Sequence, residues 1–352
     1  MKLGILGFPK SGKTTLFNLL TGAEVDTDKF GVSRESHVGI AKVPDRRLAQ
    51  LRDLYKPRKY LPATIEYVDI PGLELGKGAE DAELVALKSV DALVHVVRAF
   101  EDDEILHPSG SVNPERDIVD LDLELILADH ALVDRRREKL EQSKKRGLSQ
   151  DEKAELSLLV DKVLPQLENE QPLRALELSE DEDRRLRGFQ LLSAQPMLVV
   201  VNGDEGSLTA DLNLPLSPGV EAIAVSAPIE AEIAQLDADD QTVFLGDLGL
   251  EQASLDRILA ASYHLLGRIS FFTVGEDEVR AWTIRQGTNA HRAAGAIHSD
   301  IERGFIRAEV VAWGALLGAG SMSACRENAT LRLEGKEYLV QDGDVVHFRF
   351  NV

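Results

Sequence analysis

A glycine-rich loop near the start of the chain limits the possible folds more than any other feature. Residues 7–14 read G-F-P-K-S-G-K-T, which fits the pattern G-x-x-x-x-G-K-[ST]. The loop follows a short apolar run and opens a segment with helical spacing, the context that this motif requires. Glycines let backbone N–H groups approach phosphate oxygens, and the helix N-terminus adds positive potential. The sequence therefore predicts a phosphate-binding P-loop.

The motif also assigns roles to individual side chains. Lys13 is predicted to reach the β- and γ-phosphates, which makes it a catalytic as well as a binding residue, and Thr14 to ligate Mg²⁺. The nucleotide-binding residues predicted in this region are Gly7, Phe8, Pro9, Lys10, Ser11, Gly12, Lys13, Thr14 and Thr15.

The order of the apolar segments predicts the fold class. Strand-like runs at residues 1–7, 63–70, 92–97, 197–201 and 222–225 are separated by helical segments. Apolar strands that alternate with helices indicate an α/β fold with a parallel sheet covered on both faces.

A second motif supplies a metal ligand. Asp69-Ile70-Pro71-Gly72 closes an apolar strand and matches D-x-x-G. Asp69 is predicted to hold Mg²⁺ through water, and the Gly72 N–H to meet the γ-phosphate during catalysis. A simple turn at a strand end would explain the four residues alone, but their distance from the P-loop favours the metal site.

A third motif is placed to recognise the base. Asn202-Gly203-Asp204-Glu205 follows a β-branched strand, where GTPases carry N-K-x-D. Glu205 is longer than the aspartate that pairs with guanine, and Gly203 removes the lysine that packs over the base. Together with Ser226 and Ala227, these residues predict a base site without strict GTP specificity. The alternative is an ordinary polar loop.

The middle of the chain has a helical pattern. Asn113 and Pro114 predict an N-cap and first turn, and the helix should end near Gly147. Two capping boxes, Ser149 with Glu152 and Ser179 with Glu182, mark later helix starts. We predict a coiled-coil-like insertion, an antiparallel hairpin, whose two apolar stripes are Ile118, Leu121, Leu125, Ala128 and Leu132, and Leu156, Val160, Val163 and Leu167.

A basic stretch lies near the predicted turn of this hairpin. Its cations are either a solvated helix face or a contact for RNA phosphates. They are Arg135, Arg136, Arg137, Lys139, Lys144, Lys145 and Arg146.

The last segment changes pattern again. From residue 268, short strands alternate with turns such as Glu334-Gly335, which predicts a small α+β domain that meets RNA or protein. The predicted domains are a nucleotide-binding domain of residues 1–105 and 196–267, a helical insertion of residues 106–195, and this C-terminal domain of residues 268–352.

Composition excludes several classes of protein. The net charge of −20 argues against nucleic-acid binding over the whole surface, though not against a local basic patch. The single cysteine, Cys325, fits a reducing compartment, and we expect a cytoplasmic protein. No apolar run is long enough for a membrane span, so no membrane partner is expected.

Several stretches outside the P-loop match one family. They include Val43-Pro44-Asp45, His95-Val96-Val97-Arg98, Pro172-Leu173-Arg174, the run from Glu302 to Glu309, and the C-terminal Phe348-Arg349-Phe350-Asn351-Val352. With these the chain resembles the YchF/Obg-like ATPases, the ATP-preferring branch of the Obg GTPases. The resemblance implies that the C-terminal domain is a TGS domain, a β-grasp module associated with RNA and ribosomes.

The sequence departs from this family around the phosphates. Lys10 stands where the family has asparagine, so its ammonium either replaces a K⁺ ion or points into solvent. Ser33 falls where the family's metal-binding threonine belongs, and the second switch keeps only Gly76 and Gly78. Leu73 cannot orient water as a glutamine would.

These departures predict slow hydrolysis. His107 is a candidate for positioning water, as a histidine does in the family, unless it is merely a surface-loop histidine. We expect a Mg²⁺-dependent ATPase of slow turnover that uses ATP or GTP. Its partner is predicted to be the ribosome or RNA, contacted through the TGS-like domain and the basic stretch. The alternatives are an Obg-type GTPase, or a nucleotide-sensing binding protein with little hydrolysis.

Overall fold

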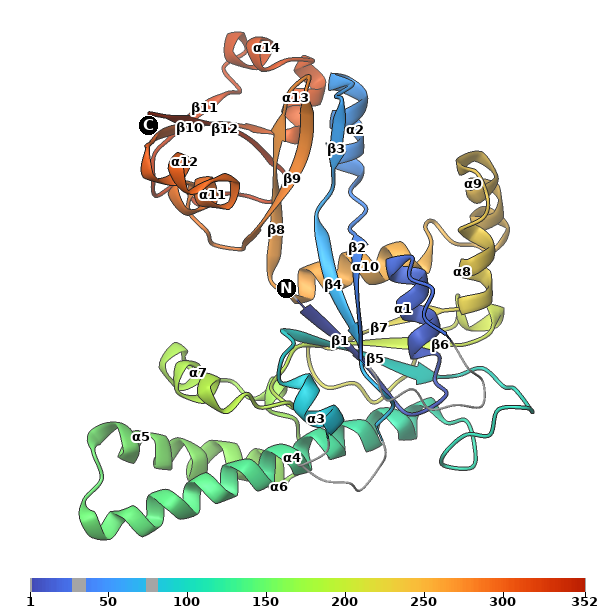
Figure 1. The fold of residues 1–352 in the computed structure, drawn as a ribbon, viewed down its shortest axis with the longest axis vertical. Helices are drawn as coiled ribbons and strands as arrows, with labels where there is room; N and C mark the ends of the chain where they lie inside the picture. The colour runs from blue at the N-terminus through green and yellow to red at the C-terminus, as the bar shows by residue number, and fades with distance from the viewer. Residues whose placement is uncertain (1, 27–35, 74–81, 352) are drawn as a thin grey trace. The chain divides into compact units, whose positions relative to one another are not determined.

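The computed structural model describes residues 2–26, 36–73 and 82–351 (Figure 1). The chain divides into two compact units. The first consists of residues Met1–Ile40 and Glu66–Ile258, and the second of Ala41–Ile65 and Leu259–Val352. Among the described residues, no helix is both long and apolar enough to cross a membrane.

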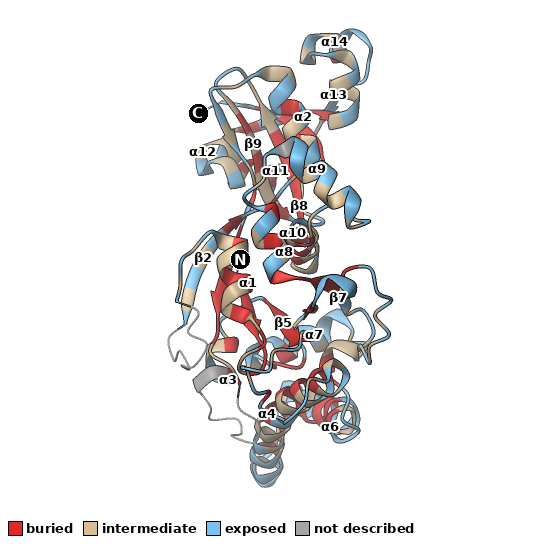
Figure 2. Cartoon of the chain, turned by 90° about the vertical axis from the view of Figure 1, so that its right-hand side faces the viewer, coloured by how far each residue is buried: buried red, intermediate tan, exposed pale blue. Residues whose placement is uncertain are grey.

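The first unit is built on a six-stranded sheet of order β2-β4-β1-β5-β6-β7. Neighbouring strands from β4 to β7 pair in parallel, which confirms the predicted α/β fold. Every residue of β5 and β6 is buried, as Figure 2 shows for the interior of this unit. The strands are β1 (Lys2–Leu6), β2 (His37–Lys42), β4 (Thr64–Asp69), β5 (Ala92–Arg98), β6 (Met197–Asn202) and β7 (Glu221–Val225).

Helices pack on this sheet. Helix α1 (Lys13–Thr21) follows the P-loop and packs beside α8 (Ala227–Ile233). A buried apolar cluster joins the strands to α3 (Ala82–Leu87) and to the first half of α4 (Pro114–Ser143). The described helices that complete this unit's C-terminal part are α9 (Ala238–Asp247) and the start of α10 (Ser254–Leu265).

The predicted long helix is present as α4. Asn113 caps it by accepting a hydrogen bond from the Arg116 N–H, and Pro114 occupies its first turn. Its 30 residues correspond to a length of about 45 Å. Its first half packs on the sheet, and its second half packs on α5 and α6 (Figure 1). Four of the five predicted stripe residues are buried: Ile118, Leu121, Leu125 and Ala128, with Leu132 half-buried.

Both capping boxes are confirmed. Ser149 and Glu152 cap α5 (Gln150–Leu158), and Ser179 and Glu182 cap α7 (Glu180–Leu186). One stripe residue was predicted wrongly, because Val160 is 42% exposed whereas Leu159 is fully buried. A π-helical turn, Leu159–Val163, interrupts the helix before α6 (Leu164–Glu168) and offsets the apolar stripe by one position.

The second unit has its own six-stranded sheet of order β11-β10-β12-β8-β9-β3. Strands β8 and β9 form a hairpin, and α11 follows them. The last long strand, β12, lies parallel to β8 and antiparallel to β10. This is a β-grasp arrangement, and it confirms the α+β prediction, whereas the TGS assignment stays a prediction. The elements are β8 (Arg268–Val274), β9 (Glu278–Arg285), α11 (Ala290–Ile297), α12 (Ser299–Arg303), β10 (Phe305–Ala312), α13 (Trp313–Ala319), α14 (Met322–Glu327), β11 (Arg332–Glu334) and β12 (Asp344–Phe350).

Residues 41–65 lie in the second unit, although the sequence pattern placed them in the nucleotide-binding domain. Strand β3 (Lys59–Leu61) extends the second sheet by pairing with β9, and α2 (Arg46–Tyr55) precedes it. Arg47 binds Asp342 at 2.7 Å and also contacts Asp45. A three-residue edge strand has no periodicity, so the sequence could not show this pairing with residues more than 200 positions away.

Candidate nucleotide-binding site

The P-loop lies between the buried end of β1 and the start of α1. Gly7 and Gly12 have positive φ angles of 148° and 92°. A Cβ on Gly7 would lie 2.3 Å from the Val96 carbonyl oxygen, and one on Gly12 would lie 2.2 Å from Asn202 Nδ2. Both positions therefore require glycine, for conformation and for space.

Lys13 is buried in this loop. Its Nζ donates a hydrogen bond to the Phe8 carbonyl at 2.8 Å. Burial lowers the pKa of Lys13 to about 8; nearby Asp69 raises the pKa, and the charge of Lys10 lowers it further. Burial removes water from the Lys13 ammonium, and the one acceptor of its protons among the described residues is a carbonyl oxygen. A phosphate bound beside it would therefore stabilise the charged form strongly, which is the behaviour expected at a phosphate site.

Asp69 and Thr14 meet beside the loop. Asp69 ends β4, where it is level with Ile5 of β1, and its Oδ2 accepts a hydrogen bond from Thr14 Oγ1 at 2.7 Å. Its other oxygen, Oδ1, is buried with no hydrogen-bond partner among the described residues. Burial raises the pKa of Asp69, while the Thr14 hydrogen bond and Lys13 lower it.

This pair of side chains fits a magnesium ion. Mg²⁺ is usually bound by one or two protein oxygens together with substrate phosphates and water. A hydroxyl beside a buried carboxylate with an unused oxygen offers that donor set. No cluster of three or more acidic, histidine or cysteine ligands occurs in the described part of the chain, so phosphate oxygens would have to complete the coordination.

Gly72 packs directly on the P-loop. A Cβ at this position would lie 2.9 Å from the Pro9 nitrogen. The next residue, Leu73, donates its N–H to the Gly7 carbonyl at 3.2 Å, and its side chain is buried in the apolar cluster. The D-x-x-G turn and the P-loop therefore form one surface.

The predicted base-recognition motif contacts the P-loop through Asn202. Asn202, the last residue of β6, donates from Nδ2 to the Ser11 carbonyl at 3.0 Å, across 191 positions of sequence. Gly203 donates its N–H to Val225, so the residues after β6 and β7 lie together. Ser226 and Ala227 are buried, whereas Glu205 is exposed at the start of a short 3₁₀ turn, Glu205–Ser207.

Lys10 has a left-handed backbone with φ of 67°. Asparagine adopts this conformation more readily than lysine does, and asparagine is the residue that the YchF/Obg-like family resemblance leads us to expect here. Lys10 is half-buried, and its charge acts on Lys13, so the ammonium contributes to the potential at the phosphate site.

His107 is held by its own loop and by α4. Its Nδ1 accepts a hydrogen bond from the Ser109 N–H at 3.1 Å, so its Nε2 carries the proton and donates to Asp117 at 2.9 Å. Both side chains are almost completely buried. In this arrangement neither ring nitrogen is available to water.

Ser33, Gly76 and Gly78 lie outside the described residues. Two residues that contact predicted site residues were not foreseen from the sequence. Asp117 orients His107, and Ser207 occupies the space beside Gly203, where a Cβ would lie 2.3 Å from Ser207 Oγ. Asp117 lies in the first turn of a capped helix, where acidic residues are common. The sequence pattern therefore could not show that Asp117 binds His107.

Three features define a P-loop nucleotide-binding protein of the GTPase fold. They are the P-loop between β1 and α1, Asp69 hydrogen-bonded to Thr14 at the end of β4, and Asn202 hydrogen-bonded to the P-loop from the end of β6. A family model described as "50S ribosome-binding GTPase" matches residues 2–128. The YchF-GTPase C-terminal model, described as a protein of unknown function (DUF933), matches residues 268–351.

The relatives identify the family. The chain is 42% identical to the "Ribosome-binding ATPase YchF" of Bacillus subtilis, with 99% of each chain covered. It is 35% identical to "Obg-like ATPase 1" of Rattus norvegicus, covering 100% of this chain and 92% of that protein. The solved Schizosaccharomyces pombe YchF GTPase matches with a TM-score of 0.85 and 31% identity, covering 99% of this chain and 97% of that one. The chain belongs to the YchF family.

Proposed function

We propose that this protein is a Mg²⁺-dependent nucleotide hydrolase of slow turnover that binds ATP at least as well as GTP and associates with ribosomes. The observation that carries the proposal is the convergence of buried Lys13 and Asp69 with half-buried Thr14 at one loop. The relatives, which include ribosome-binding ATPases and a GTPase, support hydrolysis and a ribosome partner.

Base preference depends on the end of β6. Guanine selectivity in GTPases needs an aspartate that accepts two hydrogen bonds, and here the longer Glu205 occupies that position on the surface. Gly203 cannot pack over a base. A site without those paired hydrogen bonds does not strongly reject adenine.

Magnesium would be held by Thr14 and, through water, by Asp69, with Ser33 as the remaining candidate ligand. When bound, the ion would neutralise charge on the phosphate oxygens. Lys13 would orient the β- and γ-phosphates, and the Gly72 N–H would meet the γ-phosphate.

We expect slow turnover because neither residue that could position the attacking water, Leu73 or His107, is ready to do so. Leu73 is apolar and buried. We infer that His107 performs this role only after its loop moves, because both ring nitrogens are engaged at rest. Replacing His107 with alanine should abolish hydrolysis while nucleotide affinity is kept. His347→Ala, an exposed histidine in the second unit, serves as the matched control.

The ribosome contact would involve the second unit and the basic stretch, and we propose a cytoplasmic location. Arg136 and Arg137 are bound to Glu155 and Asp134, so they are the members of that stretch with internal partners. The other five cations, Arg135, Lys139, Lys144, Lys145 and Arg146, have no ion pair among the described residues and are exposed.

Single-turnover hydrolysis of ATP and GTP, with and without purified ribosomes, tests the proposal. We expect slow phosphate release that requires Mg²⁺, is lost in Asp69→Asn and increases with ribosomes. Phosphate release no faster than in the protein-free control would leave a nucleotide-sensing binding protein. Hydrolysis of GTP alone would favour an Obg-type GTPase.

A further inference from the structure

One half of the second unit's sheet carries a cluster of arginines. Strands β11, β10 and β12 are neighbours there (Figure 1). Ala308 and Phe348 belong to the apolar cluster that this sheet forms with α11. Because side chains alternate along a strand, the residues next to them, Arg307 and Arg349, lie on the opposite face. Together with an arginine of α14 that reaches this side, they form what we call the arginine face: Arg307, Glu309, Arg326, Leu333, His347 and Arg349.

Two of these arginines lie directly opposite each other. Arg307 of β10 is the register partner of Arg349 of β12 in the antiparallel ladder. The Cβ atoms of such a pair are about 5 Å apart, and like charges in that arrangement are destabilising. Arg307 is exposed and has no ion pair in the part of the chain that the structure describes. A pair of charges that costs stability and has no internal counterion for Arg307 indicates that an anion is supplied from outside.

A single carboxylate balances the other two arginines. Glu309 accepts hydrogen bonds from Arg326 at 3.1 Å and from Arg349 at 3.0 Å, both through Oε1. Glu309 is buried, whereas the side chains of Arg326 and Arg349 are 58% and 52% exposed. A guanidinium has five N–H donors. Both arginines are therefore held in place by Glu309 and keep donors for a further anion.

The charges that act on Glu309 are all positive. Burial acts to raise the pKa of Glu309, but Arg349, Arg326 and His347 outweigh burial and hold that pKa below its ordinary value. No second acidic side chain of the described residues contributes to this shift. Three arginines and a histidine thus surround one carboxylate, on a chain whose net charge is −20. The arginine face is a local excess of positive charge.

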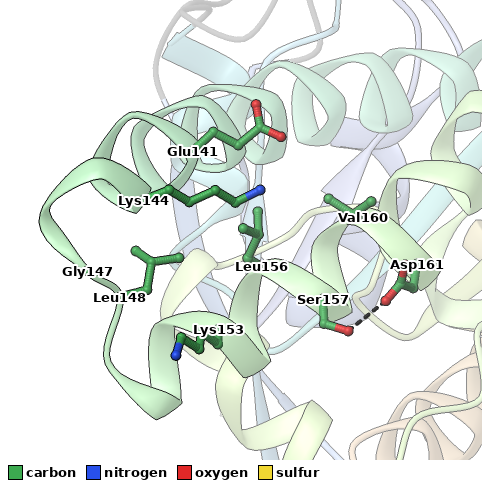
Figure 3. Close-up of a pocket in the computed structure, with 9 residues that line it drawn as sticks. All are labelled: Glu141, Lys144, Gly147, Leu148, Lys153, Leu156, Ser157, Val160 and Asp161. Carbon is green, nitrogen blue, oxygen red and sulfur yellow. Dashed lines mark hydrogen bonds between the residues drawn. The ribbon is translucent and has the colours of Figure 1, made fainter.

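The groove between the end of α4 and α5, of about 570 Å³, has no such excess (Figure 3). Its two lysines, Lys144 and Lys153, share the lining with two acidic residues, Glu141 and Asp161. The opposite charges of the groove are therefore equal in number. Of these two surfaces, the arginine face is the one whose charge selects an anion.

The chemistry of the arginine face favours RNA phosphates over an acidic protein. The planar fork of arginine matches a phosphate group with two parallel hydrogen bonds. A protein interface needs an apolar centre, and Leu333 is the one exposed apolar side chain that strand alternation places on this face among the described residues. The face contains no Phe, Tyr or Trp on which RNA bases could stack. Contacts of this kind position a nucleic acid but do not recognise its sequence.

We propose that the arginine face binds the phosphate backbone of RNA without regard to base sequence. Arg307 would bind phosphate with its whole guanidinium, and Arg326 and Arg349 with the N–H groups that Glu309 does not use. The inference rests on the proposed function in that ribosomal RNA would supply these phosphates, and it names the surface of the second unit that would meet them.

A labelled 20-nucleotide oligouridine tests the face on the full-length protein, without nucleotide or ribosomes. Fluorescence anisotropy at several salt concentrations gives the affinity and the number of phosphates that are neutralised. The comparisons are an oligoadenylate of the same length and a 20-residue polyglutamate. We expect the two RNAs to bind within about threefold of each other, and at least about tenfold more tightly than polyglutamate.

A double variant removes two cations without leaving a buried charge unpaired. Arg307→Ala with Arg326→Ala keeps the bond between Arg349 and Glu309. This variant should bind oligouridine about tenfold more weakly. The slope of log affinity against log salt concentration should fall by about 1.4, which is about 0.7 for each lost phosphate contact. The corresponding double lysine variant should keep the slope, because it keeps the charges.

A matched control removes two exposed arginines of the same unit that lie outside the face. Arg285→Ala with Arg292→Ala takes one arginine from β9 and one from α11. It should change oligouridine affinity less than twofold. Thermal melts separate binding from folding: Arg307→Ala alone should keep or raise the melting temperature, because it removes the like-charged pair with Arg349.

Three results would overturn the proposal. They are an unchanged affinity in the Arg307 and Arg326 double variant, an equal loss in the control variant, and polyglutamate binding as tight as RNA binding. The first two would show attraction by the whole unit or by another surface, and the third would show a site for acidic proteins. Sedimentation with purified ribosomes tests the proposed function separately. A protein that binds RNA through this face but does not sediment with ribosomes would refute the ribosome partner and leave the inference standing.

Discussion

The two ends of the proposed nucleotide site, the phosphate end and the base end, are built differently. At the phosphate end, Lys13 and Asp69 are buried; Lys13 donates a hydrogen bond to the Phe8 carbonyl of the P-loop, and Asp69 accepts one from Thr14 of α1. At the base end, Glu205 is exposed at the start of a short turn. Charges act more strongly where water is excluded, so affinity should come from the phosphate end. The open base end should then discriminate weakly between purines.

Removing Lys13 should have the largest effect on this comparison. Lys13→Ala takes away a buried charge that would face the phosphates, and the loss of such a partner costs about 3 kcal/mol, or roughly 100-fold in affinity. Calorimetry with ATP and GTP should show the same loss for both. The control is Lys59→Ala, which removes an exposed lysine. A loss for one nucleotide only would contradict the division between the two ends.

Nucleotide affinity should also depend on pH through Lys13. The pKa of the free protein's Lys13 is about 8, and bound phosphates would raise it, so binding above pH 8 takes up a proton. Affinity should therefore fall by about tenfold between pH 7 and pH 9. Titrations in buffers of different ionisation enthalpy would measure the proton uptake. The dependence should disappear in Lys13→Ala, and an unchanged slope there would assign it to another group.

Base preference should change only when a lysine at position 203 has space, which requires a smaller residue at position 207. Glu205→Asp with Gly203→Lys restores the GTPase pattern, but a Cβ at Gly203 would lie 2.3 Å from Ser207 Oγ. The triple variant with Ser207→Gly should shift the ATP:GTP affinity ratio toward GTP by about tenfold. Competition binding measures this ratio. An unshifted ratio would mean that these positions do not contact the base.

Replacing Lys10 with asparagine should have the smallest effect of these changes. Its φ of 67° disfavours lysine, so Lys10→Asn should stabilise the protein by about 1 kcal/mol in thermal or denaturant unfolding. Asparagine also offers an oxygen that can hold K⁺, whereas lysine has only donors. We expect hydrolysis by the native protein to be similar in K⁺ and Na⁺, and the variant to gain K⁺ stimulation.

A matched control separates the two effects of that change. Lys56 also has a left-handed backbone, with φ of 46°, at the end of α2. Lys56→Asn should relieve similar backbone strain without creating a K⁺ response. Strong K⁺ stimulation of the unaltered protein would refute the idea that Lys10 replaces the ion.

The features that the sequence predicted correctly are local ones. The P-loop, the N-cap at Asn113 and both capping boxes each depend on a few adjacent residues, and the structure contains all of them. The parallel sheet followed from apolar runs long enough to be unambiguous.

The features that the sequence could not show depend on distant partners or on irregular backbone. Strand β3 joins the second sheet through β9, far along the chain. The π-helical turn changes which residue of an apolar pair is buried: the sequence predicted Val160, and the structure buries Leu159 instead. The bond from His107 to Asp117 depends on a loop conformation that has no periodic pattern.

The most direct test of the account is a calorimetric titration of the native protein with non-hydrolysable analogues of ATP and GTP at equal Mg²⁺ concentration. The buried phosphate end should bind both, and the base end, with Glu205 and Gly203, should give ATP an affinity equal to or greater than that of GTP. Binding of the GTP analogue ten times tighter than that of the ATP analogue would contradict the account.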